Sequence, residues 1–328
     1  MFYARMAMCE FWFGDFDQAI QRGIKAVELC EASGNSEGAG FACLAMQWCY
    51  IYKCEFDQVF ALKEYILRMT DRQFSLRQYV YTFTAVSVAY TELGRWDEAV
   101  RAGQEALNAA EEFSDNSLIS FPAFAISVAL TSKGDLTRGF QYAHLSLEKA
   151  PTPADKAWAQ SMLSLALCHS GEPHRGVEVL EALVEMNRAG RYASGEVYTM
   201  LFLGQGYTLA GEYDKAVQTL KECLGLAEHS GMKSYIAQAH RLFGEVAVKT
   251  NPAVAAPHFE KSISIFREIK AENQLGLAYA GYGRFHKQQG NMTQALEYLT
   301  KALEIFERLG TLIHPDKVKE ELASLPEG

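Results

Sequence analysis

The sequence predicts an all-α protein, a right-handed α–α superhelix of about eight helix-turn-helix repeats followed by a C-terminal capping helix. The first observation is a glycine followed five positions later by a small residue, a pair that recurs in steps of 37 to 40 residues. A fixed period in this range is typical of repeat arrays, in which each unit packs against its neighbours. The second observation is helical apolar spacing on both sides of this pair, which indicates two helices in every unit.

The recurring glycine is expected to end the first helix of a unit, because glycine readily adopts the left-handed conformation. The small residue lets the second helix approach the first closely. Cys54 and Thr250 take the place of the glycine in two units, and Val59 replaces one small residue. A short polar side chain three positions after the glycine, such as Asp17, is expected to cap the second helix. The glycines are Gly14, Gly94, Gly134, Gly171, Gly211 and Gly290, and the small residues are Ala19, Ala99, Gly139, Gly176, Ala216, Ala255 and Ala295.

The units follow one another with short connections. The solenoid is expected over residues 1–309, and a capping helix that begins near Pro315, with its tail, over residues 310–328. Pro151 and Pro153 coincide with the single 37-residue step, so a change of superhelical pitch is expected near 151–153. The eight units are expected at residues 1–34, 36–74, 76–115, 117–150, 154–190, 193–231, 233–270 and 273–309.

The first helix is apolar nearly all round, with Phe2, Tyr3, Phe11, Trp12 and Phe13. Such a helix is normally buried on two sides. We expect cover from an upstream domain or from a second copy of the chain that associates through this helix. The alternative is that the second helix and the second unit of the chain itself are sufficient.

The turn pattern resembles the tetratricopeptide repeat, TPR, in which a glycine, an acidic or polar residue, an aromatic residue and an acid precede an alanine. Three segments carry it most clearly, at residues 14–19, 94–99 and 211–216. The period of about 40 residues exceeds the 34 of the standard repeat, which implies longer helices or connections.

The last third carries a narrower resemblance. It is similar to the C-terminal TPR-like arm of bacterial multidomain signalling proteins that combine a nucleotide-cyclase or kinase module with a STAND-type ATPase. This resemblance implies a scaffold arm of a larger bacterial protein, without the catalytic activity of the missing modules. The segments that carry it are residues 240–247, 257–263, 278–283 and 303–310.

Composition argues against several classes of partner and compartment. The net charge is −9 and no dense Lys/Arg run occurs, so neither nucleic acid nor an anionic membrane surface is expected as a partner. No apolar stretch is long enough to span a membrane, and the first residues do not form a secretory signal. The seven cysteines contain no C-x-x-C pair, which favours reduced thiols in a cytoplasmic protein.

The search for catalytic motifs gives no positive signal. The sequence has no phosphate-binding loop, no G-x-S-x-G elbow and no H-E-x-x-H zinc helix. Cys168, His169 and His174 lie close together, but their number and spacing do not suit a metal site. We therefore predict no enzymatic activity, no cofactor and no bound metal.

The concave face formed by the first helices is the predicted site for a protein or peptide partner. Aromatic side chains dominate its N-terminal half and polar ones its C-terminal half, which would anchor and orient an extended or helical segment. The alternative is that tight curvature buries these residues against one another. A second hypothesis is a sensor whose superhelix changes when a peptide or small molecule binds. The predicted groove residues are Met8, Phe11, Trp12, Leu44, Trp48, Tyr52, Phe124, Gln205, Arg241, Glu245, Arg284 and Lys287.

Overall fold

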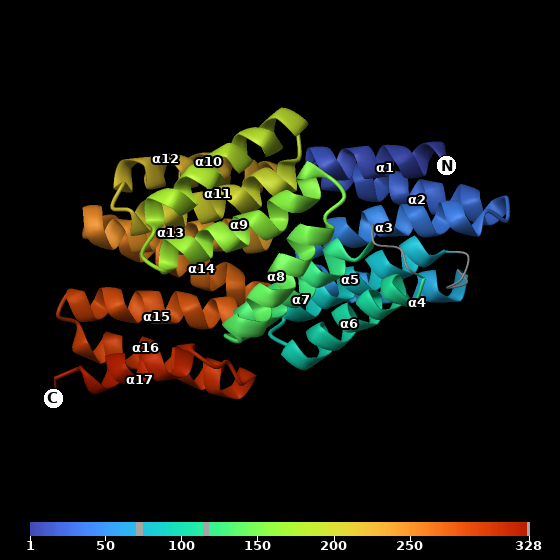
Figure 1. Ribbon diagram of the computed structural model, residues 1–328. Coiled ribbons are helices and arrows are strands. Elements are labelled where there is room, and N and C mark those ends of the chain that lie inside the picture. Colours follow the sequence, from blue (N-terminus) through green and yellow to red (C-terminus); the bar gives the residue numbers. More distant parts are fainter. Residues whose placement is uncertain (70–74, 114–117, 327–328) are drawn as a thin grey trace.

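The chain folds into an α-helical superhelix, as the sequence predicts (Figure 1). The computed structural model describes residues 1–69, 75–113 and 118–326, and within these ranges it contains seventeen α-helices. Sixteen of them form eight consecutive helix-turn-helix pairs, and α17 (His314–Ala323) follows the last pair. The predicted unit ends near residues 70–74 and 114–117, and the last two residues, lie outside the described residues.

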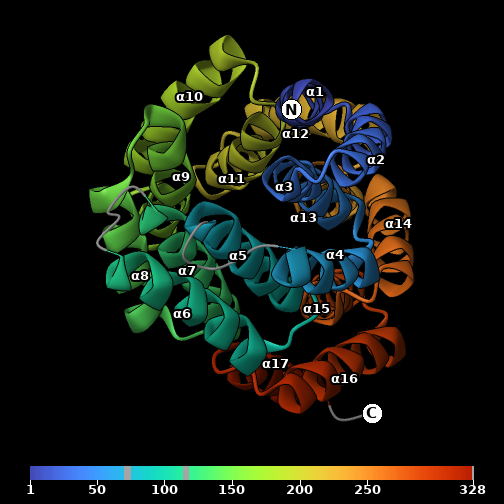
Figure 2. The ribbon, with the colours of Figure 1, turned by 90° about the vertical axis from the view of Figure 1, so that its right-hand side faces the viewer.

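The first helices of the pairs line the inside of the superhelix and the second helices cover its outside (Figure 2). The first helices are α1 (Phe2–Phe13), α3 (Ser36–Lys53), α5 (Leu76–Glu92), α7 (Ser120–Lys133), α9 (Pro153–His169), α11 (Ala193–Leu209), α13 (Lys233–Thr250) and α15 (Glu272–Gln288). The second helices are α2 (Phe16–Ala32), α4 (Phe56–Met69), α6 (Trp96–Glu112), α8 (Leu136–Lys149), α10 (Pro173–Gly190), α12 (Tyr213–Ser230), α14 (Ala255–Glu268) and α16 (Met292–Leu309).

The turn between paired helices follows the prediction in seven of the eight pairs. All six predicted turn glycines have positive φ, as at Gly14 (81°) and Gly134 (99°), and Cys54 adopts the same conformation (φ 58°) without being a glycine. The seventh pair differs, because Thr250 still belongs to α13. Asn251 and a 3₁₀ turn (Pro252–Val254) then lead into α14. The prediction that Thr250 takes the place of the turn glycine is therefore wrong.

A buried hydrogen bond joins the two helices at the position of closest approach. Ser127 Oγ on the first helix donates to the carbonyl oxygen of Gly139 on the second (2.6 Å). Where Val59 replaces the small residue, Gln47 Nε2 makes the equivalent bond to its carbonyl oxygen (3.0 Å). The longer side chain of Gln47 therefore makes this bond in the helix pair in which the bulkier Val59 replaces the small residue. This bond satisfies polar groups that burial would otherwise penalise.

The capping residue lies two positions earlier than the sequence suggested. The Asp15 side chain accepts a hydrogen bond from the backbone N–H of Gln18 (3.3 Å), which makes it the N-cap of α2. Asp17 lies inside the first turn of α2 and pairs with Lys53 of the next repeat (2.5 Å). The acid three positions after the glycine therefore links neighbouring repeats and does not cap the helix.

The superhelix winds far enough for its first turn to touch its second. Several contacts join residues remote in sequence, and we call the following four the inter-turn seam. Trp12 packs edge-on against Tyr192 with ring centroids 5.5 Å apart, and Tyr52 lies 5.8 Å from Tyr235. Ser234 Oγ donates a hydrogen bond to the Glu92 carboxylate, and the backbone N–H of Leu312 donates one to the carbonyl oxygen of Lys133 (2.7 Å). The seam therefore partly covers α1, a source of cover that neither sequence hypothesis included.

The predicted change of pitch at residues 151–153 falls between two regular repeats, and the predicted capping helix follows the last repeat. α8 ends at Lys149 and α9 begins at Pro153, with Thr152 as its N-cap. The predicted pitch change at 151–153 stays a prediction. At the C-terminus α17 packs on α16, where the His314 ring lies 5.0 Å from Phe306. Among the described helices, none combines the length and the apolar character that crossing a membrane requires.

Candidate functional site

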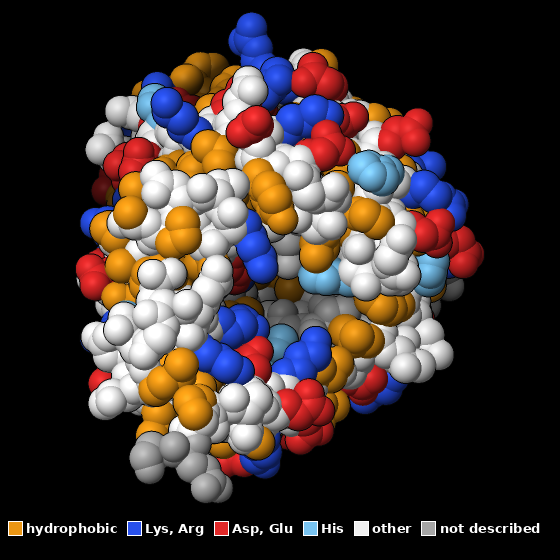
Figure 3. Space-filling view, turned by 90° about the vertical axis from the view of Figure 1, so that its left-hand side faces the viewer, with side chains coloured by type: hydrophobic (Ala, Val, Ile, Leu, Met, Phe, Trp, Pro, Cys, Tyr) orange, Lys and Arg blue, Asp and Glu red, His pale blue; other side chains and the backbone are white. Residues whose placement is uncertain are grey.

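Two adjoining cavities lie inside the superhelix. The larger has a volume of about 450 Å³ and the smaller about 210 Å³. Side chains from the inner helices line both, with additions from α8 and α17 in the larger one. The end of the molecule where α13, α15 and α17 lie has a hollow, with Lys, Arg and His side chains around its rim (Figure 3). The two cavities are neighbours, because both are bordered by Trp48, Tyr52, Phe121 and Trp158.

A continuous set of aromatic side chains lines the larger cavity where it adjoins the smaller one, and we call it the aromatic wall. It consists of Trp48, Phe121, Phe124, Trp158 and Tyr198. Ring centroids lie 5.0 Å apart for Trp48 and Phe121, 5.8 Å for Phe124 and Trp158, and 4.8 Å for Trp158 and Tyr198. These distances are those of favourable aromatic pairs. Each ring comes from the inner face of a first helix, so the repeat period brings them together.

The structure brings nine of the twelve predicted groove residues to these cavities. Several are nevertheless well buried, with Leu44 only 4% exposed and Trp48 only 8%. Tight curvature packs the rings against one another, and the same rings form the cavity walls. The burial that the second alternative expected is therefore present for several of them, and the binding role of these residues stays a prediction. The nine are Met8, Phe11, Trp12, Leu44, Trp48, Tyr52, Phe124, Gln205 and Arg241.

The remaining three predicted residues have partners of their own and do not line either cavity. Glu245 forms an ion pair with Arg241 (2.6 Å). Arg284 pairs with Glu321 of α17 (3.1 Å), and Lys287 Nζ bonds to Ser324 Oγ just after that helix (2.6 Å). The capping helix therefore engages the basic residues of α15 that the sequence assigned to the groove.

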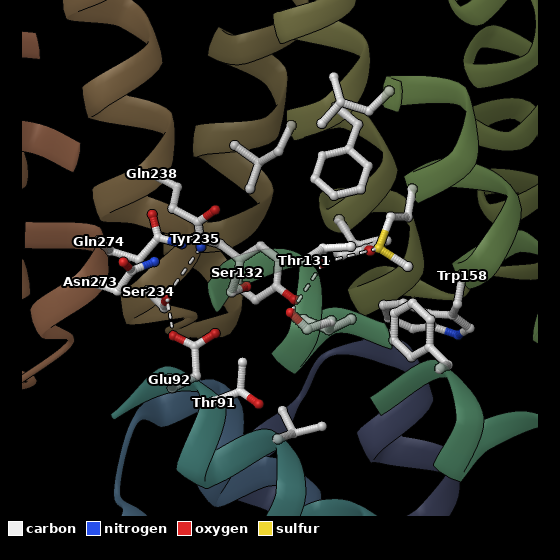
Figure 4. Close-up of a pocket in the computed structure, with 18 of the residues that line it drawn as sticks. Thr91, Glu92, Thr131, Ser132, Trp158, Ser234, Tyr235, Gln238, Asn273 and Gln274 are labelled. Carbon is white, nitrogen blue, oxygen red and sulfur yellow. Dashed lines mark hydrogen bonds between the residues drawn. The ribbon is translucent and has the colours of Figure 1, made fainter. Parts of the chain in front are cut away.

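A group of polar residues at one end of the larger cavity escaped the sequence analysis. We call Glu92, Ser234, Gln238, Asn273 and Gln274 the polar end; Figure 4 shows them gathered opposite Trp158. Ser234 Oγ donates to Glu92 (2.9 Å) and accepts from Gln238 Nε2 (3.2 Å). Glu92 and Ser234 are 142 positions apart, so reasoning within one repeat could not pair them. The available signal was only a polar residue on an otherwise apolar inner face.

The electrostatics of the larger cavity depend mainly on one carboxylate. Burial raises the pKa of the Glu92 carboxyl, and the hydrogen bond from Ser234 opposes this more weakly. Burial, aided by Lys317 and Arg241, lowers the pKa of His314 to about 4, so this imidazole is neutral at pH 7. Burial also lowers the pKa of His169. Since Glu245 neutralises Arg241, the Glu92 carboxylate is the formal charge in the lining without a counterion among the described residues.

The fold and the sequence comparisons together define the class: an all-α helical-repeat superhelix that contains TPR-like segments. Family models described as Tetratricopeptide repeat match residues 199–231 and 277–308. A model described as Anaphase-promoting complex subunit 5 matches residues 50–133. A comparison with curated proteins found no match.

Solved structures share this fold over most of the chain. A Rap protein complexed with competence and sporulation factor is 12% identical, covers 98% of this chain and 96% of its own, and has a TM-score of 0.60. The Rap conjugation gene regulator of plasmid pLS20, in complex with the Phr* peptide, is 13% identical over 90% and 75% of the two chains, with a TM-score of 0.62. The human IFIT1 dimer with PPP-AAAA is 14% identical over 98% and 72%, with a TM-score of 0.56. At such identities the likeness shows the fold.

Proposed function

We propose that the protein is a non-catalytic scaffold module that holds a peptide or a segment of a partner protein inside the superhelix. The observation that carries the proposal is the pair of adjoining cavities bordered by the aromatic wall. The larger cavity falls in the usual range for small-ligand sites, about 300–1,000 Å³. Aromatic side chains at the centre of a concave surface are the groups that most often anchor a partner.

Two of the structural neighbours support a peptide as the ligand. The Rap protein was solved with competence and sporulation factor, and the pLS20 regulator with the Phr* peptide. A groove of aromatic rings and amide side chains can take up an extended peptide, because the rings accept apolar side chains and the amides bond to its backbone.

A second candidate function is sensing, and the inter-turn seam favours it. The larger cavity is lined by α3 and α5 on one side of the seam and by α13 and α15 on the other. A ligand that touches both sides would stabilise the closed arrangement relative to an open one, because it binds one state more tightly. In that case the superhelix itself would change on binding and report the ligand to another protein.

The proposal also covers the larger protein or assembly in which the module works. Phe2 and Phe13 of α1 are 72% and 57% exposed, although α1 contacts α2, α3 and α11. Exposed rings on one helix suit an upstream domain or self-association through α1. A role as an arm of a larger cytoplasmic signalling protein in bacteria would supply such a domain. Sedimentation equilibrium of the wild type and of Phe13→Ser tests the self-association.

Blocking the larger cavity tests the binding proposal. Ala166 is half-buried in its lining, so Ala166→Trp would fill the space without removing a packed side chain. We expect this variant to retain less than a tenth of the peptide that the wild type captures from a random hexapeptide pool. Leu296→Trp, at a position 54% exposed on α16, is the matched control and should bind as the wild type does. Equal capture by Ala166→Trp and the wild type would place any binding elsewhere.

A further inference from the structure

The carboxylate of Glu92 occupies a position that calls for a cationic partner. It accepts a hydrogen bond from Ser234 (2.9 Å), and no Lys or Arg of the described chain forms an ion pair with it. A carboxylate withdrawn from water is costly unless it is paired or fully hydrogen-bonded. The only other charged residue in the cavity lining, Arg241, is engaged by Glu245 (2.6 Å). The described part of the chain therefore leaves this negative charge without a counterion.

A second observation at the same end of the cavity concerns Asn273. Its side chain is only 5% exposed and lines the cavity, yet its Oδ1 atom accepts no hydrogen bond within the described chain. Oε1 of the adjacent Gln274 is likewise buried and without a donor. Buried polar atoms in folded proteins nearly always have partners, so these two oxygens in one cavity wall keep an acceptor capacity that a ligand or a water can use. Figure 4 shows both amides beside Ser234, at the end toward which Glu92 projects.

We propose that the polar end is a subsite for a basic group of the bound peptide, an ammonium or a guanidinium. This inference rests on the proposed peptide-binding function and specifies its ligand. An ammonium offers three N–H donors and a guanidinium five, enough for the Glu92 carboxylate and the oxygens of Asn273 and Gln274 together. The charge of such a group relieves the unpaired carboxylate, and Tyr235, which also lines the cavity, presents an aromatic ring to it.

The surroundings restrict which basic ligands fit. The rim of the hollow carries Lys and Arg side chains, and Arg241 lies in the cavity lining itself (Figure 3). The single Glu92 carboxylate matches one basic group within an otherwise neutral or acidic segment, whereas further positive charges of a ligand find no free counterion in the lining. The subsite therefore selects peptides with one basic residue, or with a free amino terminus, over polyamines and polybasic segments.

The position of the subsite also connects it to the seam. Glu92 ends α5 in the first turn of the superhelix, whereas Asn273 and Gln274 begin α15 in the second. A cation held between them contacts both turns at once. Binding of the basic group therefore favours the closed arrangement of the seam.

The experiment compares Glu92→Gln with the wild type, using two kinds of probe. Glutamine can still accept the hydrogen bond from Ser234 but carries no charge. The first probe is benzamidine, an aromatic cation, with neutral benzamide as its isostere, measured by calorimetric titration. The second is a hexapeptide pool with one position fixed as lysine or as uncharged norleucine. Glu178→Gln, on the exposed side of α10, is the control carboxylate, and circular dichroism verifies the fold of each variant.

We expect the wild type and Glu178→Gln to bind benzamidine at least tenfold more tightly than benzamide, and to enrich the lysine pool. Glu92→Gln should lose both preferences and still capture norleucine peptides. If peptides bind but Glu92→Gln keeps the preference for the cation, the subsite is wrong and the peptide-binding function stands. If benzamidine shows the Glu92 dependence while no peptide binds to any protein, the peptide-binding function fails and the cation subsite stands. Binding of neither probe overturns both.

Discussion

At the residue scale, the most informative position is Glu92, because its buried environment disfavours the charged form of its carboxyl. Burial raises the pKa of this carboxyl in the folded protein, so the folded state holds the proton more tightly than the unfolded chain does. Protonation therefore stabilises the fold. The contribution is fully present below the unfolded pKa and is lost as the pH rises through the folded pKa.

A comparison of Glu92→Gln with the wild type without ligand measures this effect directly. We expect the free energies of unfolding to converge below about pH 4, where the carboxyl is protonated in both states. The glutamine variant should become the more stable of the two as the pH rises toward 7, because it has no charge to bury. Urea unfolding at several pH values checks this. A difference independent of pH would mean that the carboxylate is well solvated or paired.

Glycines in the helices provide a second test at this scale. A Cβ atom at Gly176, the small residue of the fifth repeat, would lie 2.5 Å from the carbonyl oxygen of Ser164. A Cβ atom at Gly225, in the exposed part of α12, would meet nothing within 4 Å. We expect Gly176→Ala to destabilise the protein by about 1–3 kcal/mol and Gly225→Ala to stabilise it by about 0.5–1 kcal/mol. Denaturant midpoints measure both, and equal shifts would contradict the close helix approach.

At the scale of elements, the sequence predicted the helix pairs well because the signals for a pair are local. Left-handed glycine turns and close small residues act within about a dozen positions, and the backbone responds to them directly. The errors lie where two local signals compete. Asp15 and Asp17 can both act near a helix start, and the first caps α2 while the second pairs with Lys53. After Thr250, Pro252 favours a 3₁₀ turn over the usual glycine turn.

The candidate site was predictable only in part. Residues placed by the period of their own helix could be predicted, whereas residues whose surroundings depend on a distant helix could not. Trp48 and Phe124 of the aromatic wall were among the predicted residues because each is placed by the period of its own helix. Arg284 and Lys287 do not line either cavity, and their side chains contact Glu321 of α17 and Ser324 just after it. The face of α15 that α17 covers depends on tertiary packing. The apolar period of α15 alone does not predict it.

At the scale of the whole molecule, the inter-turn seam decides whether the superhelix is open or closed. Trp12 is a half-buried ring whose contact with Tyr192 crosses the seam (5.5 Å). We expect Trp12→Ala to loosen the seam, because an aromatic pair contributes about 0.5–1.5 kcal/mol beyond burial. A loss of about 1 kcal/mol shifts an open–closed equilibrium roughly fivefold toward the open form.

Small-angle scattering measures this change as an increase in the radius of gyration. Leu296→Ala on α16, at a side chain 54% exposed, is the control and should leave the radius unchanged. A ligand that fills the larger cavity should return the Trp12→Ala protein toward the wild-type radius, since it contacts both turns. An unchanged radius in Trp12→Ala would show that the other seam contacts hold the two turns without it, and would weaken the sensing function.

The sequence by itself determined the all-α class, the eight helix pairs, the left-handed turns and the aromatic inner face, because each depends on residues close together in the chain. Only the tertiary structure decided the inter-turn seam, the engagement of α15 by α17, and the polar end formed by Glu92, Ser234 and Asn273. The physical reason is that the small rotations between successive repeats add up along the chain. A superhelix returns on itself only after several repeats, and the small rotation that each repeat adds decides which distant residues meet.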